Sequence, residues 1–102
     1  MELIMRCYFV RHGESEANTL HIISNHRFLP FIATLTQDAS LANAHILLVS
    51  HGGLFKLMLP LILSNIDTSF VSTQGINHTD YIIAELQPDG FRCLQWGEIH
   101  FG

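Results

Sequence analysis

Charged residues are scarce in this chain, and positively charged ones are the scarcest. Of 102 residues, 14% are charged, with 5 Lys+Arg against 9 Asp+Glu, which gives a formal net charge of −4. Binding to nucleic acid or to an anionic membrane surface needs clustered basic residues. The composition therefore argues against both kinds of partner and leaves room for a small ligand held at a local positive site.

Long apolar runs, targeting segments and metal-binding cysteine patterns are also missing. The longest apolar run, residues 57–63, is far shorter than the roughly 20 residues that span a bilayer. Glu2 precedes any basic residue, and no apolar stretch of signal length follows, so we expect no targeting segment. Cys7 and Cys93 lie in strand-like runs without metal-ligand spacing, which predicts buried, reduced thiols. These features together predict a cytoplasmic protein.

Apolar residues are what the chain has in abundance, at 48%. A chain of this length buries somewhat over about 60% of its unfolded surface and forms one domain, so we expect a single domain over residues 1–102. The apolar share exceeds that of an ordinary domain. It indicates a face that a partner covers or that stays uncovered.

Two short segments carry most of the chemically capable residues. RHGESEAN at residues 11–18 and SHGG at residues 50–53 each directly follow a short apolar run. They place His12 and His51 at the C-terminal ends of expected buried strands, where ligands bind in open α/β sheets. The glycine after each histidine lets the backbone approach a bound anion. Because the guanidinium of Arg11 matches phosphate oxygens two at a time, the segments predict a pocket for a phosphoryl group.

A purely structural interpretation stays open beside this one. In it, both histidines are satisfied residues at strand ends, and Arg11 is a solvated charge. Either segment alone leaves room for this interpretation, whereas the two together favour the anion pocket.

The segments resemble the signature of the histidine phosphatase superfamily, the phosphoglycerate mutase-like enzymes, in which one strand leads into RHG[ES/ET]xxN and a later strand into HGG. The resemblance implies a phosphatase, a hydrolase that passes a phosphoryl group from a small phosphate ester through a phosphohistidine. It implies that His12 is the nucleophile and that Arg11 and Asn18 hold phosphoryl oxygens. His51 would donate to the transferring group, helped by the Gly52 amide. The scheme requires no metal and no cofactor, only a small phosphorylated substrate or inorganic phosphate.

The interval between the two histidines is much shorter than the family pattern. Family members carry there a helical segment with a second phosphate-binding arginine and a glutamate that acts as general acid. Nothing in this interval resembles either motif, which predicts an internal deletion near residues 26–28 and a weakened enzyme. Arg27 or Arg6 would have to replace the arginine, and Glu14 or a water molecule the acid.

Two alternatives stand beside a slow enzyme. One is a non-catalytic phospholigand-binding or dimerising pseudophosphatase, and the other is a truncated product without a selected function. A second arginine or a carboxylate within reach of His12 would favour the enzyme.

The resemblance and the hydrophobic patterning together predict the fold. We expect a truncated phosphoglycerate mutase-like three-layer α/β sandwich, with a mixed, mostly parallel sheet of about four strands. The expected strands are residues 3–10 and 45–50 and a hairpin of residues 81–86 and 91–96 across Pro88-Asp89-Gly90. One helix would hold Pro30 in its first turn and end by Ser40, and another would cover residues 54–62.

Loss of the segment would strip one flank of the sheet. The strand at residues 44–50 would then lie at the edge, with unpaired amides and carbonyls beside an apolar run that no charge or proline protects. Such an edge invites pairing with another chain. We therefore expect a homodimer formed through residues 44–50.

Overall fold

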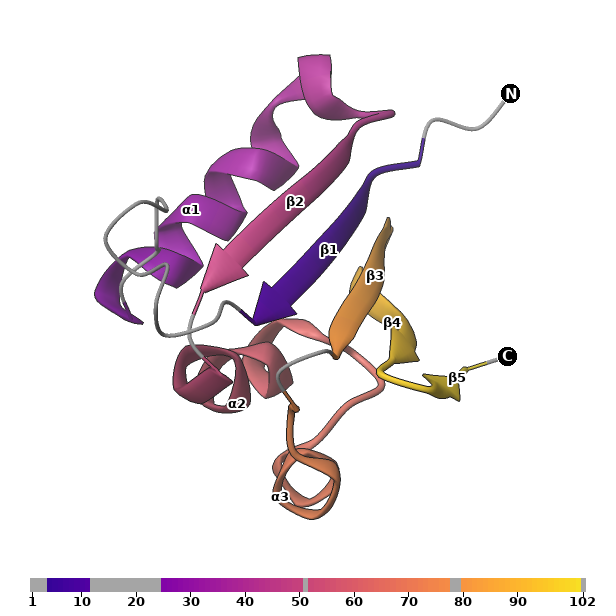
Figure 1. Ribbon diagram of the computed structural model, residues 1–102. Coiled ribbons are helices and arrows are strands. Elements are labelled where there is room, and N and C mark those ends of the chain that lie inside the picture. Colours follow the sequence, from indigo (N-terminus) through magenta and orange to yellow (C-terminus); the bar gives the residue numbers. More distant parts are fainter. Residues whose placement is uncertain (1–3, 12–24, 51, 78–79, 102) are drawn as a thin grey trace.

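A computed structural model describes residues 4–11, 25–50, 52–77 and 80–101 (Figure 1). In chain order its elements are β1 (Arg6–Arg11), α1 (Asn25–Gln37), the 3-10 helix η2 (Ala39–Leu41), β2 (His45–Ser50), α2 (Gly52–Ile62), α3 (Thr68–Gln74), β3 (Tyr81–Gln87), β4 (Gly90–Trp96) and β5 (Ile99–His100). Within these ranges no helix is long and apolar enough to cross a membrane.

The strands form one mixed sheet in the order β2-β1-β3-β4-β5. β1 pairs with β2 in parallel, with Val10 opposite Val49, and with β3 in antiparallel fashion, with Val10 opposite Tyr81. The pairs β3–β4 and β4–β5 are also antiparallel. β2 is therefore an edge strand, as the sequence predicted, and β1 lies inside the sheet.

The expectation of a mixed sheet is confirmed, and the four expected strands are present, but the expectation that the sheet is mostly parallel is wrong. Among the described residues the sheet has five strands, and only the β1–β2 strand pair is parallel. α1 supplies the crossover that this parallel pair needs. α2 and α3 together return the chain to the end of the sheet where β2 finishes, so β3 runs antiparallel to β1. The hairpin of β3 and β4 is confirmed, whereas the two-residue β5 was too short to predict.

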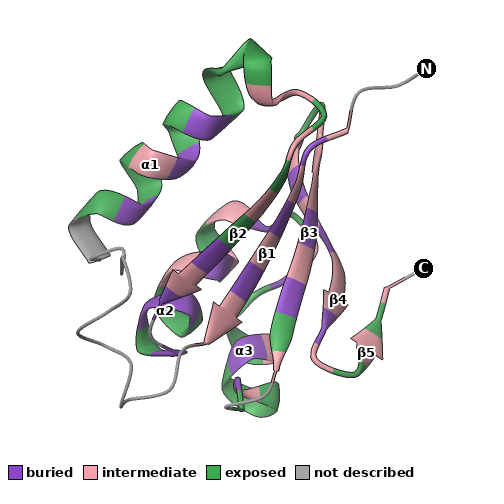
Figure 2. Cartoon of the chain, turned by 45° about the horizontal axis from the view of Figure 1, so that its top comes forward, coloured by how far each residue is buried: buried purple, intermediate pink, exposed green. Residues whose placement is uncertain are grey.

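The helices lie on one face of the sheet, and the opposite face is open in the part of the molecule that the structure describes (Figure 2). Along β1, buried Cys7 and Phe9 alternate with half-buried Tyr8 and Val10. The described residues thus form two layers, where three were expected. Some apolar surface stays uncovered on this face, since Leu47, opposite Tyr8, is 64% exposed.

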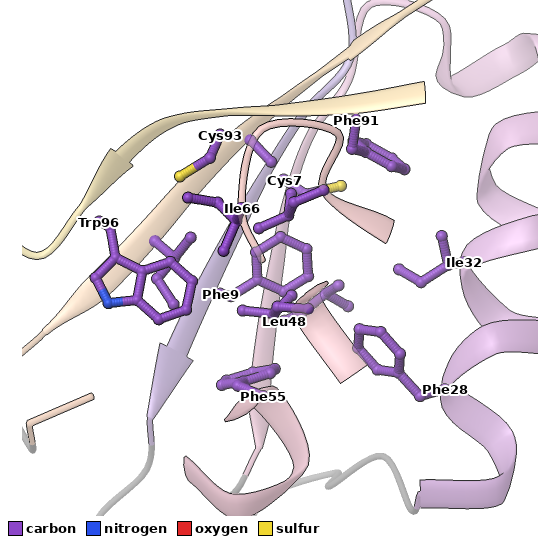
Figure 3. Close-up of a cluster of buried hydrophobic side chains, with 14 of the residues drawn as sticks. Cys7, Phe9, Phe28, Ile32, Leu48, Phe55, Ile66, Phe91, Cys93 and Trp96 are labelled. Carbon is purple, nitrogen blue, oxygen red and sulfur yellow. The ribbon is translucent and has the colours of Figure 1, made fainter. Parts of the chain in front are cut away.

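The core beneath the sheet is built around three phenylalanine rings (Figure 3). The ring centroid of Phe9 on β1 lies 5.6 Å from that of Phe55 on α2 and 6.4 Å from that of Phe28 on α1. All three side chains are fully buried. Such tilted and edge-on pairs stabilise beyond their burial, so this cluster fixes α1 and α2 against β1.

A second aromatic contact anchors α3. The Phe70 ring meets Trp96 of β4 edge-on at 5.4 Å, and the Trp96 indole N–H donates to the Gly75 carbonyl at 2.9 Å. Asp67 caps the helix by accepting from the Phe70 amide, and Gly75 ends it at φ 65°, a backbone conformation that favours glycine. The sequence carried both cap signals, but residues 68–74 were not predicted as a helix.

Pro30 lies inside α1, not in its first turn as expected. An internal proline costs about 3 kcal/mol because it removes a backbone hydrogen bond. Phe28, Ile32 and Leu35 recur at helical spacing and are buried, and this burial offsets the cost. The helix expected over residues 54–62 is confirmed and begins slightly earlier, at Gly52.

The sequence predicted a buried strand, and β1 is buried on one of its two faces. Arg6 lies on the open face, where its guanidinium is 3.6 Å from the Glu85 carboxylate. Cys7 and Cys93 are buried, free thiols, as predicted. Burial raises the pKa of each to about 11, so neither is a ready nucleophile at neutral pH.

Candidate functional site

The C-terminal ends of β1 and β2 form the candidate site. The register places Arg11 opposite Ser50, and neighbouring strands lie about 4.8 Å apart. His12 and His51 directly follow these two paired residues in the sequence but, like Asn18, fall outside the described residues. The two motifs therefore start from adjacent points at one end of the sheet, where β1 and β2 finish.

α2 begins at this same end of the sheet, directly after β2 (Figure 1). A helix N-terminus presents free amide groups and the positive end of the helix dipole. Gly52, its first residue, is buried. The start of α2 thus adds hydrogen-bond donors at the end of the sheet from which the two motifs follow.

The Arg11 side chain lies across the first turn of α2. A Cβ atom at Gly52 would lie 3.0 Å from Arg11 Nε and 3.3 Å from Cζ, whereas one at Gly53 would have no neighbour within 4 Å. Gly52 is therefore the glycine that close packing requires. The sequence argument treated both glycines alike, and only the structure separates them.

Arg11 is also tied to the loop after α3. One guanidinium nitrogen donates to the Ile76 carbonyl at 2.5 Å, and Ile76 itself is buried. A guanidinium has five N–H donors, so this bond orients the group and still allows it to contact a ligand. The sequence analysis missed the Ile76 carbonyl, because a backbone acceptor in a distant loop leaves no signal in residue types.

The two arginines proposed as replacements end up at different places. Arg6 pairs with Glu85 and lies five residues before Arg11, so at about 3.3 Å per residue it is roughly 17 Å away at the other end of β1. Arg6 is therefore excluded as the second phosphate ligand. Arg27 is exposed and sits beside Phe28 in the first turns of α1, at the end of the sheet where β1 and β2 finish (Figure 1).

Asp80 lies near this end of the sheet, because Tyr81, the next residue, pairs with Val10. Its side chain lies against the turn after β4, where a Cβ atom at Gly97 would meet the carboxylate at 3.2 to 3.3 Å. One carboxylate oxygen accepts from the Asn77 amide at 3.0 Å. Asp80 therefore ties the loop at residues 75–77 to the start of β3. Glu14, the acid named from the sequence, falls outside the described residues.

A shallow polar hollow lies on the far side of that loop. It has a volume of about 370 Å³, and Gln74, Asn77, Asp80 and Glu98 are among the residues that line it. The loop separates it from Arg11, since the Gly75 carbonyl accepts from Trp96 and the Ile76 carbonyl from Arg11. Neither Arg11 nor Ile76 lines the hollow, so it lies apart from the candidate site.

The geometry of the described residues thus brings Arg11 and Gly52 together and aligns the chain positions from which both histidines follow. In those ranges no group of three His, Cys, Asp or Glu side chains is arranged to hold a metal ion. A comparison of the chain with protein-family models, curated proteins and solved structures found no match.

Proposed function

We propose that the chain is a histidine-type phosphatase of the phosphoglycerate mutase-like kind, which transfers a phosphoryl group from a small phosphate ester to His12. The observation that carries this proposal is the pairing of Arg11 with Ser50 at the ends of two parallel neighbours. It supports convergence of the two motifs on one ligand. The proposal also draws on the resemblance of both motifs to the histidine phosphatase signature.

The chemistry needs a nucleophile, donors for the phosphoryl oxygens and a proton for the leaving group. A neutral imidazole nitrogen of His12 attacks phosphorus, the P–N bond forms and the ester P–O bond breaks. Arg11, Asn18 and the Gly52 amide stabilise the charge on the equatorial oxygens, and His51 donates to the same group. Water then attacks the phosphohistidine and releases inorganic phosphate.

The proton donor is the weak point of the scheme. Loss of a general acid costs about 10²- to 10⁴-fold in rate, and loss of one charge-stabilising donor about 10²- to 10³-fold. With Arg6 paired to Glu85, Arg27 is the remaining candidate for the second arginine. We therefore expect slow turnover that is fastest on esters of acidic alcohols, which leave without protonation.

Trapping the intermediate tests the function. The protein is mixed with an aryl phosphate, quenched and assayed for an acid-labile, base-stable phosphoenzyme, with and without EDTA. We expect phosphoenzyme in the wild-type chain regardless of EDTA, and none in His12→Ala. Activity that persists unchanged in His12→Ala, or that EDTA abolishes, would contradict the proposal.

A non-catalytic phospholigand-binding protein is the second candidate. The orientation of the Asp80 carboxylate toward Gly97 and Asn77 favours it, because that carboxylate is already held within the fold. On this alternative, phosphate still raises the melting temperature and Arg11→Ala removes the effect. No phosphoenzyme accumulates with any ester, which separates binding from catalysis.

A further inference from the structure

The outer edge of β2 carries a regular row of backbone groups. In a parallel ladder, alternate residues direct their N–H and C=O to the same neighbour. The Ala44 carbonyl accepts from the Arg6 amide at 3.0 Å. The backbone N–H and C=O groups of the even-numbered residues in this segment therefore point toward β1. The backbone groups of His45, Leu47 and Val49 therefore point away from the sheet.

The side chains along this edge lack the features that normally protect it. Natural edges carry charges, prolines or bulges, or are very short. β2 has six residues without Asp, Glu, Lys, Arg or Pro, and Leu47 is 64% exposed. Across residues 28–50, which include most of α1, Asp38 is the one residue with a full charge at neutral pH.

We propose that β2 pairs with β2 of a second copy of this chain, in antiparallel fashion, with Leu47 opposite Leu47 on the two-fold axis. This register puts His45 opposite Val49 of the partner subunit and Val49 opposite the partner's His45. All three outward-facing residues then exchange backbone hydrogen bonds, and none is left over. The result is one continuous ten-stranded sheet whose two open faces lie side by side.

A second copy fits this edge better than an unrelated strand for two reasons. The row of three outward-facing residues has a central member, so it is self-complementary about a two-fold axis, the commonest symmetry of assemblies. The chain carries a net charge of −4, yet this flank is nearly uncharged, so two copies meet there with little repulsion. The proposal rests on the fold alone and is independent of the proposed function.

The first test is the oligomeric state of the full chain, measured by sedimentation equilibrium over a range of concentrations. We expect a monomer–dimer equilibrium whose dissociation constant rises at least tenfold in Leu47→Lys. Leu61→Lys is the matched control, since Leu61 on α2 is 65% exposed and lies off the edge, and it should leave the constant unchanged. A wild-type chain that stays monomeric at high concentration, or equal effects of the two variants, would overturn the proposal.

Proline substitutions test the direction of the backbone groups. Proline lacks an N–H and is tolerated in edge strands where that N–H faces outward. Val49→Pro should therefore keep the circular dichroism of the folded chain and lose the dimer, whereas Leu48→Pro, which removes a bond to β1, should unfold it. A dimer that survives in a folded Val49→Pro chain would contradict the pairing.

Cross-linking tests the register. Because the pKa of Cys7 and of Cys93 is raised to about 11, the native thiols react slowly at neutral pH. Leu47→Cys should then give a covalent dimer under mild oxidation, and Leu61→Cys should not. Cross-linking through Val49→Cys but not Leu47→Cys would overturn the register centred on Leu47.

Discussion

The two sides of the sheet differ in how their outer backbone groups are covered. On the β4 side, the chain after α2 lies along β4 and forms hydrogen bonds with its outward-facing backbone groups. The Ser64 amide donates to the Phe91 carbonyl at 2.8 Å. The Asn65 side chain accepts from the Cys93 amide at 2.8 Å and donates to the Cys93 carbonyl at 3.0 Å. The short β5 pairs with the rest of β4.

The β2 side has no such cover among the described residues. It is held to the molecule by its ladder to β1 and by the aromatic core beneath. One edge is thus closed by hydrogen bonds from the chain itself, and the other is anchored by its ladder to β1 and by packing.

Removal of a core ring on the β2 side should have the largest effect. Phe28→Ala removes a fully buried ring from the contact of α1 with Phe9 and Phe55, and we expect a loss of about 3–5 kcal/mol in the free energy of unfolding. That is a large part of the roughly 5–15 kcal/mol of a typical domain. Urea denaturation measures the loss, and hydrogen exchange should show β1–β2 amides losing protection before those of β3–β4.

Phe31→Ala is the control on the same helix, because Phe31 is only partly buried. It should cost clearly less. If the two substitutions cost the same, or if exchange rises equally in both halves of the sheet, packing through α1 is not what holds the β2 side.

The covered edge should respond to loss of its side-chain bonds. Asn65→Ala leaves the amide and carbonyl of Cys93 without their partner, and each unsatisfied group costs about 1–3 kcal/mol. We expect a loss of about 2–4 kcal/mol by urea denaturation, with faster exchange in β4. Asn43→Ala, at an exposed position, should stay within about 0.5 kcal/mol of the wild type. A similarly small effect of Asn65→Ala would mean that the edge is not closed by these bonds.

The same contrast shows which features the sequence could predict. β2, α2 and the hairpin were predicted because each rests on local signals: an apolar run, a glycine-led helix, and a Pro-Asp-Gly turn. The edge position of β2 followed from the expected loss of one flank of the sheet. The closure by Asn65 and the anchoring of Arg11 to Ile76 could not be predicted, since each joins residues far apart in the sequence. The expectation of a mostly parallel sheet rested on the resemblance to the histidine phosphatases. It failed because the described residues contain one parallel strand pair, β1–β2.

Alkaline pH should lower the free energy of unfolding by a smaller amount, through one buried thiol on β1 and another on β4. Burial raises the pKa of Cys7, on β1, and of Cys93, on β4, from 9.0 to about 11. The unfolded chain therefore releases these protons at lower pH than the folded one, so their contribution to stability is full below pH 9 and falls as pH rises toward 11. Urea midpoints between pH 8 and 11 should decline, and Cys7→Ala and Cys93→Ala should each flatten the decline. A decline unchanged in both variants would assign it to other groups.

The smallest effect on stability is expected from alanine substitutions at Gly52 and Gly53. The same two variants test whether the proposed phosphate site lies at Arg11, beside the start of α2. Gly53→Ala adds a methyl group in open space and lowers the cost of forming the helix, so we expect a gain of about 0.5 kcal/mol. Gly52→Ala pushes against Arg11 Nε at 3.0 Å. The guanidinium is the flexible end of its side chain, so the fold survives, but the group moves off its position beside α2. Thermal unfolding with and without phosphate measures the consequence: the phosphate-dependent rise in melting temperature should persist in Gly53→Ala and shrink in Gly52→Ala. If both variants keep the full rise, the placement of Arg11 against α2 is structural and the phosphate binds elsewhere.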